Sequence, residues 1–213
     1  MSKISSIRKE YSQQSLLEQD IEKHPIKQFD KWWQQAIESE IDEVNAMTLA
    51  TVNEAGMPTA RIVLLKDYDE SGFTFYTNYL STKGKNIDHN PNVVLVFFWK
   101  ELERQVRIEG VAEKVSPIIR DEYYDSRPLE SKIGAWASPQ SQIIASRSVL
   151  QNNFSKLEND FKDQPIKRPD HWGGYKVIPN KIEFWQGRPG RLHDRIEYSK
   201  INDNNWNTVR LAP

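Results

Sequence analysis

Residues 184–195 read Phe-Trp-Gln-Gly-Arg-Pro-Gly-Arg-Leu-His-Asp-Arg, a turn sequence between two stretches of apolar or alternating residues. Gly187 and Gly190 enclose a proline, and this spacing predicts a β-hairpin. Hairpins join neighbouring antiparallel strands, so the sequence indicates that the chain ends in an antiparallel sheet.

The second arm of this hairpin carries three basic side chains. Arg191, His193 and Arg195 are two positions apart, so on a strand they would share one face at intervals of roughly 6.5–7 Å. Arginine binds phosphate or carboxylate, histidine exchanges a proton near neutral pH, and Trp185 on the first arm adds an aromatic wall. The row suits an anionic, planar ligand, although an edge strand with charges facing water would also fit.

Length and composition limit the classes of protein to which the chain can belong. Its 213 residues suffice for one domain with a real core, and a net charge of −1 marks no polyanion-binding surface. The chain has no cysteine, which excludes disulfides, thiolate metal sites and a cysteine nucleophile. The four histidines are widely spaced, so we expect no metal site.

The sequence shows no sign of a targeting or membrane segment. Residues 1–20 are polar and charged, and the longest apolar run, residues 93–99, is too short to span a bilayer. We therefore expect a cytoplasmic protein.

The N-terminal part is predicted to be an arm followed by a helix. Residues 1–25 are polar and are expected to be loosely ordered. Phe29 and the residues three, four, seven and eight positions after it are all apolar, which predicts an amphipathic helix over residues 26–40 that packs on the core.

From residue 46 onward the apolar residues mostly repeat at every second position, which predicts strands. The expected strands are 46–52, 58–66, 73–77, 92–99, 104–115, 172–178, the hairpin arms and 206–210; the expected helices are 82–90, 117–125, 128–136 and one carrying Leu150, Phe154, Leu157 and Phe161. About seven or eight antiparallel strands interrupted by helices favour a mainly β fold with helices (α+β), a closed or split antiparallel barrel forming a single domain over residues 1–213.

Residues 61–66 combine charge with aliphatic character. Arg61 and Lys66 bracket four aliphatic residues on a strand that we expect to be central. Central strands rarely begin and end with unpartnered charges, so phosphate binding is slightly favoured over charges that simply reach solvent.

Two further clusters combine hydroxyl groups with cations. In the segment 76–83, Tyr-Thr-Asn-Tyr-Leu-Ser-Thr-Lys, Ser81 can cap a helix whose free N–H groups favour an anion. Tyr123, Arg127 and Ser131 are spaced four residues apart and could converge across two short helices. The alternatives are an ordinary capped helix and a polar helical surface.

The sequence shows no Gly-rich phosphate loop, Ser-His-Asp triad or carboxylate pair, so hydrolysis has no visible machinery. The clusters supply enough cations for two phosphates and enough aromatic residues for flat rings. We therefore expect a bound cofactor to carry the chemistry.

Taken together, these segments resemble the pyridoxine/pyridoxamine 5'-phosphate oxidase family. The matching stretches follow in family order along nearly the whole chain: 61–66 (RIVLLK), 75–78 (FYTN), 102–106 (LERQV), 126–128 (SRP), 131–136 (SKIGAW), 172–174 (WGG), 184–187 (FWQG), 191–195 (RLHDR) and 210–213 (RLAP).

The resemblance implies a split-barrel homodimer with two FMN sites at the subunit interface. It assigns cofactor binding to Arg61, Ile62, Val63, Leu64, Leu65, Lys66, Tyr76, Thr77, Thr82, Lys83, Gln105, Gln140, Ser141, Trp185 and Arg195. It assigns substrate binding to Arg8, Tyr11, Lys66, Tyr123, Arg127, Ser131, Arg191 and His193, of which Arg191 and His193 face the reacting carbon. Arg8 and Tyr11 match an arm that closes over the substrate.

The implied reaction passes a hydride from C4' of pyridoxine or pyridoxamine 5'-phosphate to flavin N5, and O2 then reoxidises the flavin to give hydrogen peroxide. The product is pyridoxal 5'-phosphate. Two positions depart from the family pattern: Thr82 stands where an arginine is usual, and Lys9 replaces the second arginine of the arm. A flavin-binding barrel without turnover is the main alternative, and a nucleic-acid-binding barrel is disfavoured by the near-zero net charge.

Overall fold

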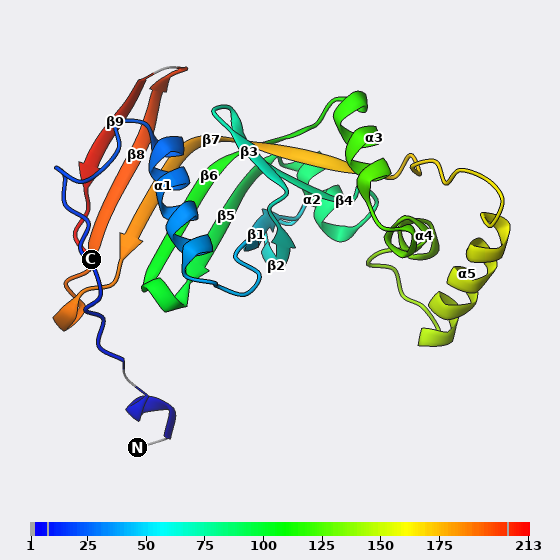
Figure 1. The fold of residues 1–213 in the computed structure, drawn as a ribbon, viewed down its shortest axis with the longest axis horizontal. Helices are drawn as coiled ribbons and strands as arrows, with labels where there is room; N and C mark the ends of the chain where they lie inside the picture. Colours follow the sequence, from blue (N-terminus) through cyan, green and yellow to red (C-terminus); the bar gives the residue numbers. More distant parts are fainter. Residues whose placement is uncertain (1–2, 8, 204) are drawn as a thin grey trace.

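The computed structural model describes residues 3–7, 9–203 and 205–213, and nine strands in these ranges form one antiparallel sheet (Figure 1). The strands are β1 (Ala46–Val52), β2 (Pro58–Leu64), β3 (Asp67–Asp69), β4 (Gly72–Asn78), β5 (Asn92–Trp99), β6 (Arg104–Lys114), β7 (Trp172–Gln186), β8 (Asp194–Asn202) and β9 (Asn205–Arg210). The helices are α1 (Pro25–Glu38), α2 (Thr82–His89), α3 (Pro117–Ser126), α4 (Leu129–Ala137) and α5 (Arg147–Asp160), with 3-10 turns η1 (Lys3–Ser6), η2 (Lys100–Leu102) and η3 (Pro189–Arg191).

Strand β7, with 15 residues, connects the two halves of the sheet. On one edge it pairs with β6 along nearly its whole length. On its other edge residues 172–177 pair with β4 and residues 181–186 pair with β8. The sheet therefore branches at β7, with β4 and β3 leaving at one end and the β8–β9 hairpin at the other. This is the split barrel of the α+β class that the sequence predicts.

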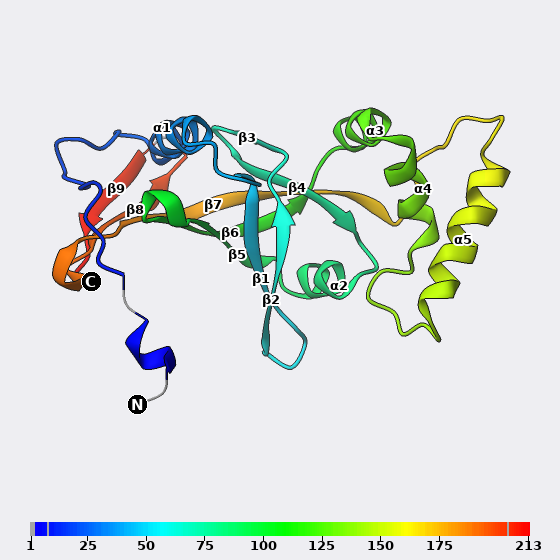
Figure 2. The same ribbon diagram turned by 60° about the horizontal axis from the view of Figure 1, so that its bottom comes forward.

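Helix α1 packs across one face of the sheet and contributes much of the core (Figure 2). Phe29 and Trp32 are buried, with the Phe29 ring 4.9 Å from Phe73 and the Trp32 ring 5.2 Å from Phe184. Burying one such side chain stabilises a fold by about 1.5–3 kcal/mol. The predicted packing of this helix is confirmed.

The opposite face of the sheet carries exposed apolar side chains. Ile62 on β2 is 64% exposed and Phe98 on β5 is 54% exposed. Along β5 the residues alternate between buried and less buried, as expected for a strand whose two faces meet different surroundings. Exposed apolar side chains on one sheet face are typical of a surface that another chain covers.

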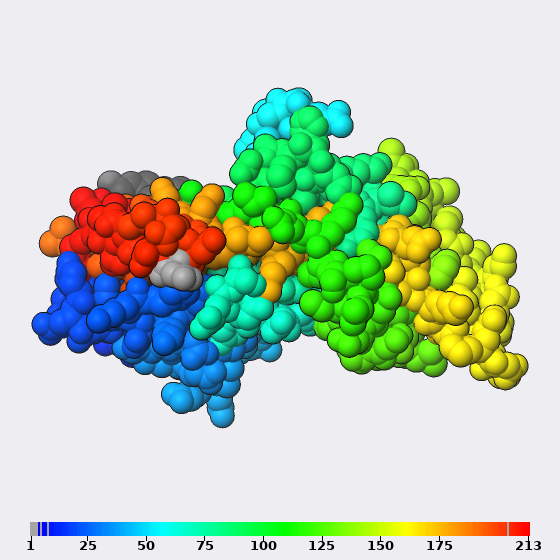
Figure 3. All heavy atoms as spheres, turned by 90° about the horizontal axis from the view of Figure 1, so that it is seen from above, coloured from blue at the N-terminus to red at the C-terminus, as the bar shows by residue number. Residues whose placement is uncertain are grey.

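Helices α3, α4 and α5 lie at one end of the long axis of the molecule, and the β8–β9 hairpin lies at the other end (Figures 1 and 3). The predicted α5 is confirmed, but its apolar side is only half-buried, against α4. None of the helices in the described ranges is long and apolar enough to cross a membrane.

The bounds predicted for α1, α2, β1 and β5 are confirmed to within two residues. The prediction that β2 is central is wrong, because β2 lies at the edge of the sheet and pairs only with β1 in the described part of the chain. Its aliphatic run resembles a buried strand, yet only Leu65, just beyond its end, is buried. Residues 67–69 form a short strand where a turn was expected, and the predicted strand 172–178 and the first hairpin arm are one continuous strand, β7, so the described part of the chain has nine strands.

The prediction that the N-terminal arm is loosely ordered is wrong between Lys9 and Glu18. Leu16 is buried, and its N–H donates to the Asp194 carboxylate at 3.0 Å. Glu18 forms an ion pair with Arg210 at 2.6 Å. Polar composition is common to mobile and docked segments, so only these contacts with distant residues show that the arm is docked.

Candidate active site

A cavity of about 490 Å³ lies between β2, β4, the start of α2 and helices α3 and α4, and we call it the β4 cavity. Four clusters that are separate in the sequence meet there. The predicted site residues that line it are Ile62, Val63, Leu64, Lys66, Tyr76, Thr77, Lys83, Tyr123, Arg127, Ser131 and Gln140.

Lys83 projects from the first turn of α2 into the β4 cavity, after a helix start that Ser81 caps as predicted. Its ammonium group donates to Thr77 Oγ1 at 3.2 Å, Ser81 Oγ at 3.4 Å and Gln140 Oε1 at 3.0 Å. Burial, followed by the charge of Arg61, lowers the pKa of Lys83. An ammonium group whose described partners are all neutral oxygens is suited to an anion.

Arg61 lies on β2, close enough to Lys83 to affect its charge, although it does not line the β4 cavity itself. Its guanidinium group donates to Leu49 O at 3.1 Å, Thr51 Oγ1 at 2.8 Å and Thr59 Oγ1 at 2.7 Å. Burial lowers the pKa of Arg61. The Arg61–Lys83 pair therefore has no carboxylate partner in the described part of the chain, and a bound anion would stabilise it.

Aromatic rings form one wall of the β4 cavity. The ring of Tyr76 stacks on Tyr123, with centroids 3.8 Å apart, and on Trp172, with centroids 5.5 Å apart. Burial raises the pKa of Tyr76 to about 12, so its hydroxyl group stays protonated. Trp172 was not among the residues predicted for the site, although it lies in the matched WGG segment.

Arg127 has an unsatisfied hydrogen-bond donor at this wall. Its guanidinium carbon lies 4.4 Å from the centre of the Trp172 ring, and its Nη1 atom is buried without a hydrogen-bond partner in the described ranges. Burial lowers the pKa of Arg127. An unpaired buried donor costs about 1–3 kcal/mol, and an anion reached also by Lys66 and Ser131 would remove that cost.

A second group of predicted residues lies at the far end of β7. Gln105 on β6 is in register with Trp185 on β7, which is in register with Arg195 on β8. Directly opposed residues of neighbouring strands share a face, so an amide, an indole and a guanidinium group form one row. Phe98 on β5 continues this row.

Glu183, which was not among the predicted site residues, holds Arg195 in place. The Arg195 guanidinium group donates from Nε and Nη2 to the two carboxylate oxygens of Glu183, each at 3.0 Å. Arg107 donates to the same carboxylate at 2.6 Å. Glu183 is only 3% exposed, and its hydrogen bonds raise the pKa of Arg195. The sequence alone does not show that Glu183 pairs with these arginines, because it contains this carboxylate only as one of many charged residues on predicted strands.

Arg191 and His193 do not share the strand face predicted for them. Pro189–Arg191 form the 3-10 turn η3, in which Gly190 and Arg191 have φ values of 64° and 62°. Strand β8 begins only at Asp194. Alternation along a strand therefore applies to Arg195 but not to the residues before it, and the predicted single row is wrong.

The η3 turn nevertheless brings His193 against Trp185. The His193 and Trp185 ring centroids are 4.6 Å apart, and the Tyr11 ring meets Trp185 edge-on at 5.8 Å. His193 Nδ1 accepts a hydrogen bond from the Arg188 N–H at 3.1 Å, so the neutral ring carries its proton on Nε2. Burial, followed by the charge of Arg191, lowers the pKa of His193.

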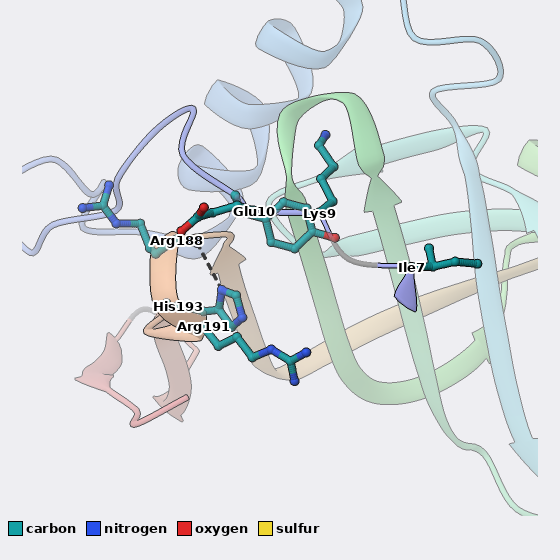
Figure 4. A pocket seen from close by; sticks show the side chains of 8 residues that line it. Ile7, Lys9, Glu10, Arg188, Arg191 and His193 are labelled. Atoms are coloured by element: carbon teal, nitrogen blue, oxygen red, sulfur yellow. Dashed lines mark hydrogen bonds between the residues drawn. The ribbon is translucent and has the colours of Figure 1, made fainter. Parts of the chain in front are cut away.

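The arm and the η3 turn enclose a second cavity of about 520 Å³, which we call the turn cavity (Figure 4). It is lined by Ile7, Lys9, Glu10, Tyr11, Arg188, Gly190, Arg191 and His193. Three of the predicted substrate-binding residues, Tyr11, Arg191 and His193, therefore meet in one place.

The two groups of site residues lie at opposite ends of β7. Trp172, the first residue of the strand, lines the β4 cavity, whereas Trp185, near its end, contacts Tyr11 and His193. At about 3.3 Å per residue these tryptophans are roughly 40 Å apart along the strand. No mononucleotide spans that distance, so one chain does not bring the two groups to a common ligand.

The remaining predicted residues have less direct positions. Leu65 belongs to the core, Thr82 is exposed at the start of α2, and Ser141 is exposed beside Gln140 with a φ of 69°. Arg8 lies outside the described residues.

Two family models match the chain. One, described as pyridoxamine 5'-phosphate oxidase, matches residues 33–159, and the other, described as pyridoxine 5'-phosphate oxidase C-terminal dimerisation region, matches residues 172–213. The second match covers β7, β8 and β9, which carry Trp185 and Arg195, and the segment between β7 and β8, which carries His193.

Relatives of known name match over their full length. A pyridoxine/pyridoxamine 5'-phosphate oxidase from a Cyanothece species is 54% identical over 210 residues, which cover 99% of this chain and 98% of the relative. Pyridoxine/pyridoxamine 5'-phosphate oxidase 1 from Ralstonia nicotianae is 54% identical over 213 residues and 100% of both chains.

Solved structures share the fold. PhzG from Burkholderia lata, solved with tetrahydrophenazine-1-carboxylic acid, has a TM-score of 0.88 and 26% identity, covering 95% of this chain and 100% of that one. A pyridoxamine 5'-phosphate oxidase-related, FMN-binding protein from Nostoc punctiforme has a TM-score of 0.71 and 15% identity, covering 91% of this chain and 100% of that one.

Proposed function

The chain belongs to the pyridoxamine 5'-phosphate oxidase family and is an oxidoreductase, and from this we propose that it oxidises pyridoxine 5'-phosphate or pyridoxamine 5'-phosphate to pyridoxal 5'-phosphate, with FMN as its cofactor. Bound FMN would supply a hydride acceptor at N5 and return the electrons to O2, giving hydrogen peroxide. We also infer that the single sheet is one domain.

The residues around Lys83 fit the phosphate of FMN. Arg61 and Lys83 are partly buried cations without a carboxylate partner in the described ranges, and Thr77 and Gln140 add polar groups at hydrogen-bond distance from Lys83. Together with the free N–H groups of the α2 start, they would neutralise a phosphate dianion. Side chains and a helix start thus replace a Gly-rich loop.

The substrate phosphate would lie on the other side of the β4 cavity. Lys66, Tyr123, Arg127 and Ser131 line it together. The observation that carries this assignment is the buried Nη1 of Arg127, which lacks a partner among the described residues. A phosphate oxygen would accept from it, while the Trp172 ring keeps the guanidinium group in place.

Arg191, His193 and Trp185 would position the pyridine ring. In its neutral form His193 accepts from the Arg188 N–H and presents Nε2–H, so it acts as a hydrogen-bond donor rather than as a base. Arg191, on the rim of the turn cavity, would cover the ring and exclude water. Arg195, held by Glu183, would contact the cofactor.

These assignments need two chains. The β4 cavity and the turn cavity lie at opposite ends of β7. A homodimer would place the β4 cavity of one protomer against the turn cavity of its partner and against the partner's row of Gln105, Trp185 and Arg195. The exposed Ile62 and Phe98 support this arrangement, because a partner would cover them. The match of residues 172–213 to a dimerisation region also supports it.

A visible spectrum followed by an oxygen electrode tests the proposal. The purified protein should show the absorbance bands of an oxidised flavin, with one FMN per chain, and should consume O2 when pyridoxine 5'-phosphate is added. Flavin without O2 consumption would favour the alternative, a flavin-binding barrel without turnover. A colourless protein that takes up no added FMN would overturn the assignment of the cofactor.

A further inference from the structure

Residues 9–18 of the arm lie along the corner where β6 begins and β7 ends. This segment is held mainly by charged side chains from elsewhere in the chain. The contacting residues are Glu103, Arg104, Arg188, Asp194 and Arg210. The arm is thus fixed at several points, and each point restrains a different part of it.

Glu103 restrains the part nearest the turn cavity. Its Oε2 atom accepts the backbone N–H groups of Ser12 at 2.9 Å and Gln13 at 3.2 Å, and its Oε1 lies 3.3 Å from Lys9 Nζ. The side chain is only 2% exposed. A buried carboxylate needs its oxygens satisfied, and the described partners of this one all come from the arm.

The backbone of Glu103 is tied to the end of β7. It follows η2 with a φ of 57°, and its carbonyl oxygen accepts from the Gly187 N–H at 2.8 Å and from Gln186 Nε2 at 3.2 Å. Glu103 therefore binds the arm through its side chain, and it binds the residues at the end of β7 through its carbonyl oxygen.

Tyr11 lies between the points that Glu103 holds. Its ring meets Trp185 edge-on and lies 6.0 Å from the His193 ring. It also packs directly on Gly187, where a Cβ atom would come within 2.7 Å of Tyr11 Cγ. Since Lys9 and Ser12 flank Tyr11 and both bind Glu103, the place of the tyrosine ring depends on that carboxylate.

We propose that Glu103 is a positioning residue for substrate binding: it docks residues 9–13 and so holds Tyr11 against Trp185 and His193. This inference rests on the proposed function, in which Tyr11 covers the substrate. Glu103 itself lines neither cavity, and it acts on the turn cavity through the arm, by binding Lys9 and the backbone on either side of Tyr11. Its loss should change the binding of substrate and leave the binding of FMN unchanged.

Hydrogen exchange of the full-length protein tests the docking without requiring turnover. In Glu103→Gln, which keeps size but loses charge and one acceptor oxygen, the amides of Ser12 and Gln13 should exchange at least roughly tenfold faster. The amide of Leu16, which Asp194 holds, should keep its rate. Glu101→Gln, the same change on an exposed neighbour, is the control. Unchanged exchange at residues 12 and 13 would overturn the docking.

Steady-state kinetics and a double-mutant cycle test the positioning. Glu103→Gln should raise KM for pyridoxine 5'-phosphate roughly tenfold and change kcat less than about twofold, with FMN affinity unchanged. Tyr11→Ala should raise KM similarly while residues 12 and 13 keep their slow exchange. The double variant should be no worse than the Tyr11→Ala variant. Additive losses would show that Glu103 does not act through Tyr11.

A second variant covers the case in which Glu103→Gln does not fold. Gln13→Pro removes one of the two N–H donors from the arm side and leaves the buried carboxylate in place. It should also speed exchange at residue 12 and raise KM, and unchanged values in both would contradict the proposal. If the wild-type protein consumes no O2, the affinity of each variant for pyridoxal 5'-phosphate, measured by tryptophan fluorescence, replaces KM. Failure of the proposed function can then be distinguished from failure of the proposal for Glu103.

Discussion

Thr82 is the residue at which the resemblance predicts a departure from the family pattern, within the proposed cofactor site. It is exposed at the first position of α2, next to Lys83. Thr82→Arg would add a cation and a guanidinium fork where the phosphate of FMN is expected. We predict that FMN binds about tenfold more tightly, a gain of about 1–2 kcal/mol, because charge-assisted hydrogen bonds to phosphate are of this strength. Fluorescence titration of the apoprotein with FMN measures it.

The control for this change is Thr82→Val, which keeps the shape of the side chain and adds no charge. It should leave FMN affinity within about twofold, since the threonine hydroxyl is not part of the hydrogen-bond network of Lys83 in the described contacts. Equal or weaker binding of FMN by Thr82→Arg would mean that the phosphate lies elsewhere.

Arg127 and Lys66 are predicted to recognise the substrate phosphate. Arg127→Ala and Lys66→Ala should each raise KM for pyridoxine 5'-phosphate by at least about tenfold, because each removes a cation from a dianion. Arg127→Lys should recover only part of the loss, since lysine lacks the planar fork. Arg147→Ala, an exposed arginine at the start of α5, is the control. Equal activity on unphosphorylated pyridoxine would show that these residues do not bind the phosphate.

At the scale of elements, the η3 turn and strand β8 divide the basic motif at residues 191–195 between two tasks. Arg191 lies in η3 and His193 in the short segment between η3 and β8, whereas Arg195 is fixed on β8 by Glu183. Arg191→Ala and His193→Ala should keep FMN but lose about 10²-fold in kcat/KM, because the substrate ring is no longer held at a reactive distance. Arg195→Leu should lose FMN instead.

Flavin content and kcat/KM measured side by side for these three variants decide the division. The His193→Ala variant should lose activity although His193 does not act as a base, since Nδ1 of this histidine already accepts a hydrogen bond from the Arg188 N–H. A parallel loss of flavin in all three variants, or full activity of His193→Ala, would contradict the assignment of the turn to the substrate.

At the scale of the whole molecule, sequence patterns predicted the elements better than their arrangement. The bounds of β5 and α2 follow from alternation and from capping by Ser81, which are local properties. The edge position of β2 does not follow from local properties, because an aliphatic run has the same pattern whether a core or a partner chain covers it. Neither does the η3 turn, where Arg191 has a φ of 62°, a value uncommon for a residue other than glycine.

The candidate site shows the same limit. The cationic and aromatic residues could be assigned from their chemistry and from the family resemblance, and the structure brings most of them into two groups. The carboxylates that hold these groups, Glu103 and Glu183, could not, because a carboxylate in a sequence does not show which distant cation or N–H group it meets. Long-range pairing decides their role.

The separation of the two groups along β7 is tested most directly by mixing two variants that are each impaired at a different cavity. Arg127→Ala damages only the β4 cavity and His193→Ala damages only the turn cavity. If each site combines one cavity from each protomer, random exchange of subunits makes half of the dimers mixed, each with one intact site. The kcat/KM should then rise to about a quarter of the wild-type value. A mixture whose kcat/KM stays at the average of the two impaired variants would show that each site is built within one chain.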